Sequence, residues 1–422
     1  MKKMLLSLLL VLTFLLPCFG AFAESGDVTT VTWYASRPVD GGIDLTIREI
    51  AAQYSAKMGG KWELKVETTA DRPSYLQKLK TMIAGGNMPD IIDIDADPYC
   101  QQLVDAGMLV DVKTFLQDEG KYDAFYPTAL AYQEFTNGTM YTLPLEYHVE
   151  MIWYNVDMFK ANNITVPKTM DEWLADCETL DKAGIVPISV DGVDRWPVQR
   201  YLAMIPFRLT GNDYIINLRD GKASMGDEEG LKAIDFVQKI GKYFNEGFGA
   251  TDYATAESMF LDGKSAMYYM GDWEQNAMLE QYDAGKVDYF YLPMYEGATT
   301  AENEFCVNSG IGMAFNSTTF DAKTRDFILY LIANYGKIYA SHQQMSPMKV
   351  ELPADIQFTD LYKRIAADMN WTGKKFLKPW DCYLDANTNT VVADNLLLLA
   401  SGDMTGEEFI NLVDASIQAN VE

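Results

Sequence analysis

Hydrophobic residues follow two alternating spacings over the first hundred positions. Short β-branched and aromatic runs at 29–34, 64–66 and 87–92 have the pattern of strands. Between them, apolar residues recur every three or four positions, as on one face of a helix: Ile43, Ile47, Ile50, Tyr54 and Met58, then Leu76, Leu79, Met82 and Ile83. The order strand, helix, strand, helix, strand predicts a parallel sheet covered by helices on both faces.

The next segment, 141–189, predicts a strand followed by two helices. An apolar run ends at Asn155, a short helical turn covers 157–161, and a longer helix begins at Thr169. Thr169 and Glu172 have the T-x-x-E spacing of a capping box, which marks a helix N-terminus. Gly184 closes this helix.

Residues 253–277 predict a helix, a stop at Gly263, a strand over 265–270 and a further helix. The last helix opens at Gly271-Asp272-Trp273, and we expect Asp272 to cap it. Trp273 therefore stands at the carboxyl end of a strand, where clefts form in α/β folds.

The N-terminus has the pattern of an export signal over 1–23. A basic start at Lys2 and Lys3 precedes an apolar run too short to span a membrane, and a small-x-small site ends at Ala23. Cys18 leaves lipid anchoring open as an alternative to free secretion, although Pro17 disfavours it.

Composition narrows the choice of partners. The chain carries 60 acidic and 34 basic residues, a formal net charge of −26, so we expect no binding to nucleic acid or anionic lipid. The other cysteines are Cys100, Cys177, Cys306 and Cys382, and none of them lies in a C-x-x-C pair. Their spacing is compatible with either disulfides or free thiols.

Several segments carry a family resemblance. Residues 75–90 (YLQKLKTMIAGGNMPD), 141–189, 260–273 and 400–409 resemble, in order, the motifs of bacterial extracellular solute-binding proteins that deliver sugars to ABC importers, the maltose-binding-protein-like group. The resemblance implies an α/β, two-lobe periplasmic-binding-protein fold, with a ligand cleft between the lobes and multiple hinge crossings. It places the N-terminal lobe at 24–145 plus 310–344, the C-terminal lobe at 146–305 plus 349–422, and hinge segments at 306–309 and 345–348.

The same resemblance selects candidate ligand contacts. A sugar site needs flat aromatic platforms together with hydrogen-bond donors and acceptors. The chain has 8 Trp, 25 Tyr and 20 Phe, most of which must be core, so position has to select among them. The candidates lie at expected strand ends, crossings and loops: Trp273, Asp95, Asp97, Trp33, Ser36, Arg37, Asp40, Glu146, Tyr147, His148, Trp196 and Trp380. Core packing is the alternative for Trp33, and a solvated turn is the alternative for Asp95 and Asp97.

These observations favour a non-catalytic receptor. We expect a carbohydrate ligand, an ABC transporter permease as partner, no cofactor and no metal, in an exported, periplasmic or extracellular monomer. Neither the 93–98 run nor His148-x-Glu150 completes a calcium or zinc pattern. A polyamine on Asp95, Asp97, Glu146 and Asp194 is the alternative ligand, and a secreted glycan-active enzyme is a remote one. Arg37 and Arg200 leave acidic sugars open.

Overall fold

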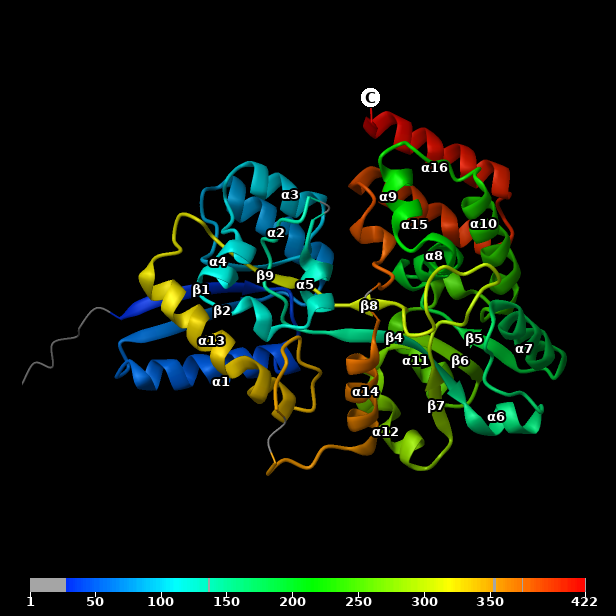
Figure 1. Cartoon of the computed structure of the whole chain (residues 1–422), viewed down its shortest axis with the longest axis horizontal. Coiled ribbons are helices and arrows are strands. Elements are labelled where there is room, and N and C mark those ends of the chain that lie inside the picture. Colours follow the sequence, from blue (N-terminus) through cyan, green and yellow to red (C-terminus); the bar gives the residue numbers. More distant parts are fainter. Residues whose placement is uncertain (1–27, 136, 352–353, 374, 422) are drawn as a thin grey trace, which may run out of the picture.

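The computed structural model describes residues 28–135, 137–351, 354–373 and 375–421. Its elements gather around two separate sheets, which Figure 1 shows on the two sides of the molecule. We call the part built on the first sheet the first lobe and the part built on the second sheet the second lobe. The predicted signal segment, with Cys18, lies outside the described residues.

The first sheet has the strand order β2-β1-β3-β9. Its strands are β1 Thr29–Ala35, β2 Trp62–Thr68, β3 Ile91–Ile94 and β9 Gly312–Phe315. β1 pairs in parallel with both β2 and β3, as the βαβ pattern predicts, whereas β9 returns from far along the chain and pairs antiparallel with β3. The third strand starts later than the predicted Asn87, and Pro89 lacks the N–H that a ladder needs.

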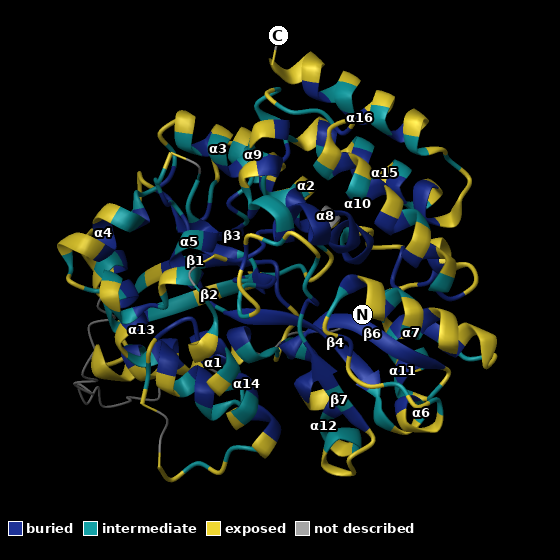
Figure 2. Cartoon of the chain, turned by 45° about the vertical axis from the view of Figure 1, so that its right-hand side comes forward, coloured by how far each residue is buried: buried dark blue, intermediate teal, exposed yellow. Residues whose placement is uncertain are grey.

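Helices cover both faces of this sheet. They are α1 Gly42–Lys57, α2 Arg72–Ala84, α3 Pro98–Asp105, α4 Val112–Asp118, α5 Pro127–Gln133 and α13 Ala322–Ser341, with the short turn η1 Tyr122–Ala124. Trp33 and Ile91 pack with α1 and α13 on one face, while Tyr34 and Ile92 pack with α2 and α3 on the other. Figure 2 shows the strands buried beneath the half-exposed helices.

The second sheet has the order β5-β6-β4-β7, with β8 added to the start of β4. Its strands are β4 His148–Asn155, β5 Val186–Ser189, β6 Ser265–Gly271, β7 Val287–Phe290 and β8 Val307–Asn308. β5 and β6 are parallel, so their carboxyl ends meet at one edge of the sheet. β8 and the start of β4, which pair with each other, lie between the two sheets (Figure 1).

The second lobe contains the remaining helices. They are α6 Val156–Ala161, α7 Met170–Lys182, α8 Trp196–Thr210, α9 Asp213–Arg219, α10 Glu228–Ile240, α11 Tyr253–Leu261, α12 Gln275–Asp283, α14 Asp360–Trp371, α15 Ala386–Ser401 and α16 Gly406–Val421, with the short turns η2 Gly241–Tyr243, η3 Phe248–Ala250, η4 Asp272–Glu274 and η5 Trp380–Cys382. The predicted capping box of α7 is present, because Thr169 Oγ1 accepts the Glu172 N–H at 3.2 Å and the Glu172 carboxylate accepts the Thr169 N–H at 3.3 Å.

The hydrophobic cores follow the two sheets. One draws on residues 129–307 and 345–417, and the others on 31–145 and 313–348. α5 lies between them, since Leu130 packs in a first-lobe core and Tyr132 packs in the second-lobe core. The lobe boundaries expected from sequence stay a prediction.

Candidate functional site

Trp273 stands at the edge of the second sheet where β6 ends. Its indole lies over Gly271 so closely that a Cβ added to that glycine would be 2.1 Å from the ring. The Trp273 Nε1–H donates to the Tyr253 hydroxyl at 2.9 Å. The ring is half-buried, so the glycine and the hydrogen bond hold an indole that still has exposed surface.

A second predicted tryptophan lies against the first. The rings of Trp196 and Trp273 are 6.0 Å apart and tilted by 65°, an edge-on contact, and Trp196 is also half-buried. The guanidinium of Arg200, one turn further along α8, lies 4.9 Å from the Trp196 ring centroid. Trp196 and Trp273, two candidates predicted from the sequence, are therefore in contact in the fold.

Arg200 belongs to a buried ion cluster beneath these rings. Its Nε lies 2.9 Å from Glu150 Oε2, and its Nη1 lies 3.3 Å from Asp381 Oδ1. Burial by itself would raise the pKa of Glu150, but the charge of Arg200 outweighs it and the pKa is lowered. Glu150 also accepts the Tyr269 hydroxyl at 2.7 Å, so it is a satisfied carboxylate.

A chain of charged groups runs from the first lobe into the second. Arg37 Nε bonds Asp93 Oδ2 at 3.0 Å, and its Nη1 bonds Glu146 Oε1 at 2.7 Å. Glu146 Oε2 is 3.1 Å from His148 Nε2, and His148 Nδ1 is 3.1 Å from Asp272 Oδ2. We call these five residues the hinge ion chain, because Arg37 follows β1 of one lobe and His148 begins β4 of the other.

The hinge ion chain fixes its own charge states. Burial would lower the pKa of His148, but Asp272 and Glu146 raise it to about 10. Burial would raise the pKa of Glu146, but Arg37 and His148 lower it to about 2. At neutral pH the hinge ion chain therefore consists of an imidazolium and a guanidinium that alternate with three carboxyl groups.

The expectation that Asp272 caps the helix after β6 is wrong. Its carboxylate accepts the Val149 N–H at 2.8 Å and faces the His148 ring, and no side chain caps η4. The residue is buried because it joins two strands of the second sheet rather than facing solvent.

The remaining predicted residues after β1 have local roles. Ser36 is buried and its backbone N–H donates to Asp93 Oδ2 at 2.9 Å. Asp40 is exposed with a φ of 63°, and its N–H donates to Asp44 Oδ2 at 3.2 Å. Neither side chain joins the paired tryptophans.

Three predicted aromatic residues are core residues. Trp33 is 1 % exposed and donates its indole N–H to Asp93 at 3.0 Å. Tyr147 is buried, and Trp380 is 3 % exposed with its ring 6.2 Å from Tyr214 inside the second lobe. Their rings do not present a face to a ligand in this structure, so a platform role is not supported for them.

Of the two predicted aspartates after β3, Asp97 lines the first-lobe side of a cavity and Asp95 does not. Asp95 forms an ion pair with Arg72, and Asp97 caps α3 by accepting the Cys100 N–H at 2.8 Å. Burial and the neighbouring charge of Asp95 raise the pKa of Asp97 to about 6.

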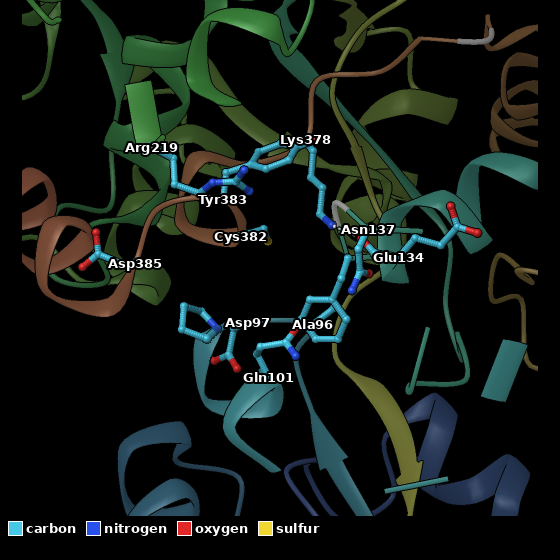
Figure 3. A pocket seen from close by; sticks show the side chains of 12 residues that line it. Ala96, Asp97, Gln101, Glu134, Asn137, Arg219, Lys378, Cys382, Tyr383 and Asp385 are labelled. Atoms are coloured by element: carbon cyan, nitrogen blue, oxygen red, sulfur yellow. Dashed lines mark hydrogen bonds between the residues drawn. The ribbon is translucent and has the colours of Figure 1, made fainter. Parts of the chain in front are cut away.

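The cavity has a volume of about 270 Å³ and is lined from both lobes, as Figure 3 shows. The lining residues are Ala96, Asp97, Pro98, Gln101, Glu134, Phe135, Asn137, Arg219, Lys378, Cys382, Tyr383 and Asp385. Of these, only Asp97 was a sequence candidate. The others come from separate helices and loops that only the packing of the lobes brings together, and the local sequence carries no signal for them.

Within the described ranges, no three His, Cys, Asp or Glu side chains are grouped as metal ligands would be. Cys100, Cys177, Cys306 and Cys382 are free thiols. No described helix has both the length and the hydropathy required to cross a bilayer.

Known proteins share this architecture. A chitin oligosaccharide binding protein superposes with a TM-score of 0.78 at 20 % identity, covering 94 % of this chain and 100 % of that one. One relative is an uncharacterized ABC transporter extracellular-binding protein of Pyrococcus horikoshii, which is 25 % identical over 222 residues. The match covers 52 % of this chain and 50 % of the relative, so the chain spans about half of that relative's length. A multiple sugar-binding protein of Streptococcus mutans is 23 % identical over 378 residues, covering 85 % of this chain and 86 % of the relative.

The family follows from a match to most of the chain. The model of one family covers residues 49–357, from α1 of the first lobe through the second sheet to the segment before α14. That span includes the paired tryptophans and the hinge ion chain from Asp93 onward. This chain therefore belongs to the bacterial extracellular solute-binding proteins.

Proposed function

We propose that this protein is the extracytoplasmic receptor of an ABC importer, binds a carbohydrate between its lobes, and presents it to the permease by lobe closure. The observation that carries the proposal is the pair of half-buried indoles, Trp196 and Trp273, at the edge of the second sheet. Sugar rings have apolar C–H faces that stack on such surfaces, while their hydroxyls need charged or polar partners nearby.

The surroundings of the indoles suit that chemistry. Arg200 lies over the Trp196 ring and bonds Asp381, and the two residues that follow Asp381 in sequence, Cys382 and Tyr383, line the cavity between the lobes. The names of the Streptococcus mutans relative and of the chitin oligosaccharide binding protein support a saccharide as the ligand.

Closure requires two lobes joined by a hinge. We take the lobes as 24–145 plus 310–344 and 146–305 plus 349–422, joined at 306–309 and 345–348. The separate sheets and cores support this division, and β8 and the start of β4, between the two sheets, are the natural place for a hinge.

A binding role without catalysis fits the carboxylates. A glycosidase needs a carboxylic acid whose pKa is raised so that it can donate a proton. The pKa of Glu146 and that of Glu150 are both lowered, because Arg37 and Arg200 hold them as anions against the effect of burial, so neither is such an acid. Burial raises the pKa of Asp97 to about 6 and that of Glu274 to about 7, so the pKa values exclude Glu146 and Glu150 alone as proton donors. We infer an exported monomer, released or anchored through Cys18.

The test is thermal unfolding of the purified exported protein with mono- and oligosaccharides, uronic acids, polyamines and amino acids. A ligand present at ~1,000 times its dissociation constant adds roughly 4 kcal/mol of stability, which is a large shift in melting temperature. Trp273→Ala should abolish the shift without changing unfolding of the unliganded protein much.

The matched control is Tyr330→Ala, which removes another half-buried ring, on the outer helix α13. It should leave the ligand shift intact. If polyamines stabilise the protein and no saccharide does, the sugar assignment is lost although the fold assignment stands.

A further inference from the structure

The strongest unexplained feature is the side chain of Lys378. It follows α14 on the loop before η5 and is only 4 % exposed. Within the described part of the chain, its ammonium donates one hydrogen bond, to the Glu134 carbonyl oxygen at 3.1 Å. An ammonium has three donors, so two remain to be filled.

The described carboxylates nearest to Lys378 act on it only from a distance, and Glu134 and Asp381 offset part of the effect of its burial. Among the described residues it forms no ion pair within 4 Å, and the neighbouring acids have other partners. The Glu134 carboxylate bonds Lys113 at 2.7 Å, and the Asp381 carboxylate bonds Arg200 at 3.3 Å. Burial accordingly lowers the pKa of Lys378.

Aromatic rings give the cation partial compensation. The Nζ of Lys378 lies 5.5 Å from the Tyr132 ring centroid and 5.4 Å from that of Tyr383. Such contacts stabilise a cation less than a buried counter-ion does. The site therefore favours a ligand that brings negative charge.

The two walls of the cavity differ in chemistry (Figure 3). Lys378 and Arg219 come from the second lobe, whereas Asp97 and Gln101 come from α3 of the first. Arg219 is held by Asp220, with its Nη2 2.6 Å from Oδ1. The same wall carries Asp385, whose carboxylate caps α15 by accepting the Asn387 N–H at 2.9 Å. Lys378 is therefore the group on this wall that suits a carboxylate, and the wall with Asp97 suits hydroxyl donors.

We propose that this cavity binds a saccharide unit bearing a carboxylate, with the carboxylate on Lys378 and the ring hydroxyls on the α3 wall. A carboxylate fills both free ammonium donors and removes the cost of an uncompensated buried charge. A neutral sugar supplies acceptors without charge, and a polyamine would place a second cation on this wall. The inference rests on the proposed function and names the class of sugar.

The experiment compares probes that differ only in charge. Uronic acids from one to three units (galacturonate and glucuronate series) are titrated calorimetrically beside their methyl esters. The exported protein should bind at least one acid roughly tenfold or more tightly than its ester, the worth of one charge-assisted hydrogen bond. Lys378→Met should weaken binding of the acid more than binding of the ester and so remove that preference.

Two further variants make the result specific. Lys378→Arg keeps the charge and should keep the preference, while Lys375→Met removes an exposed charge from the same loop and should change nothing. Thermal unfolding without ligand shows that each variant folds. Should Lys378→Met not fold, the acid and ester comparison on the unaltered protein and on Lys378→Arg still decides.

Other outcomes separate the two proposals. If neutral oligosaccharides bind and uronic acids do not, or if acids and esters bind equally, the charged-sugar inference is overturned while the receptor function stands. Equal loss of acid and ester binding in Lys378→Met would make the lysine structural and also overturn it. If no saccharide binds at all, both proposals fall.

Discussion

Replacing His148 by glutamine tests the hinge ion chain most directly. The imidazolium lies between two carboxylates, with Nδ1 3.1 Å from Asp272 Oδ2 and Nε2 3.1 Å from Glu146 Oε2. A glutamine amide keeps hydrogen-bonding capacity but has no charge. The change therefore leaves two buried carboxylates without the cation between them.

The size of the effect follows from the pKa of His148. Its rise from 6.5 to about 10 corresponds to a ceiling of roughly 5 kcal/mol, at about 1.4 kcal/mol for each pKa unit. Removing one partner of a buried ion pair costs about 3–5 kcal/mol, and Arg37 still neutralises Glu146 in the variant. We expect a loss of about 3 kcal/mol in the free energy of unfolding near pH 6.

The pH dependence gives the sharper criterion. Because the folded-state pKa of His148 is raised, its contribution is complete below the unfolded value of 6.5 and is lost as the pH rises through about 10. Glu146, whose pKa is lowered to about 2, stays charged over that range. The stability of the unaltered protein should therefore approach that of His148→Gln as the pH rises.

Urea unfolding of both proteins between about pH 6 and about pH 9.5 measures this difference. The control is His342→Gln, because His342 is half-buried and lies 3.5 Å from Glu49, a surface pair worth about 0–1 kcal/mol. A difference below about 1 kcal/mol, or one that stays constant with pH, would refute the reasoning.

Two glycines give further predictions. Gly310 has a φ of 57°, and a Cβ there would lie 1.8 Å from Glu146 Oε1. At Gly263, which also has a positive φ, a Cβ would meet only a methionine methyl at 3.9 Å, so Gly263→Ala should lower the free energy of unfolding by only ~1 kcal/mol. Gly310→Ala should cost clearly more than that in urea unfolding. Equal costs for the two variants would contradict the placement of Glu146. Gly271→Ala should displace the Trp273 ring and abolish saccharide binding in calorimetry while the fold is retained, and unchanged affinity would show that the ring does not hold the ligand.

The sequence predicted those features that neighbouring residues determine. The capping box at Thr169 and the strand predicted over 265–270 need only residues a few positions apart, and both are confirmed, although the strand includes Gly271 as well. The parallel order of the first three strands also follows from a local rhythm of strand and helix.

The sequence could not predict side-chain partners that are far apart along the chain. Arg37 was a candidate ligand contact, yet its guanidinium bonds carboxylates 56 and 109 residues away in sequence, Asp93 and Glu146. Trp196 and Trp380 each adjoin a proline at the start of a helical turn, but one is half-exposed and the other is core. Which surface each faces depends on what the rest of the chain packs against it.

Lys378 illustrates the same limit. Lys378 stands two positions before Trp380, and the sequence indicates the tryptophan rather than the lysine as the platform for a sugar. Lys378 is a candidate ligand contact because it is buried and forms no ion pair with a described carboxylate. Its nearest carboxylates have other partners, since Glu134 bonds Lys113 and Asp381 bonds Arg200, and these pairs form only in the folded chain.

The proposed platform and the hinge share a residue, which bears on how binding and closure can be linked. The ring of His148 meets the Trp273 indole edge-on, 5.4 Å between centroids and 88° between planes, and the same imidazolium bonds Glu146 at the crossing between lobes. A motion that moved Glu146 relative to His148 would therefore act on the group packed behind the platform. By linkage, a ligand that stacked on Trp273 more strongly in one lobe arrangement would stabilise that arrangement by the same free energy. A motion that separated Glu146 from His148 would leave buried charges without their partners, so the hinge ion chain would oppose such a motion unless new partners replaced the lost ones.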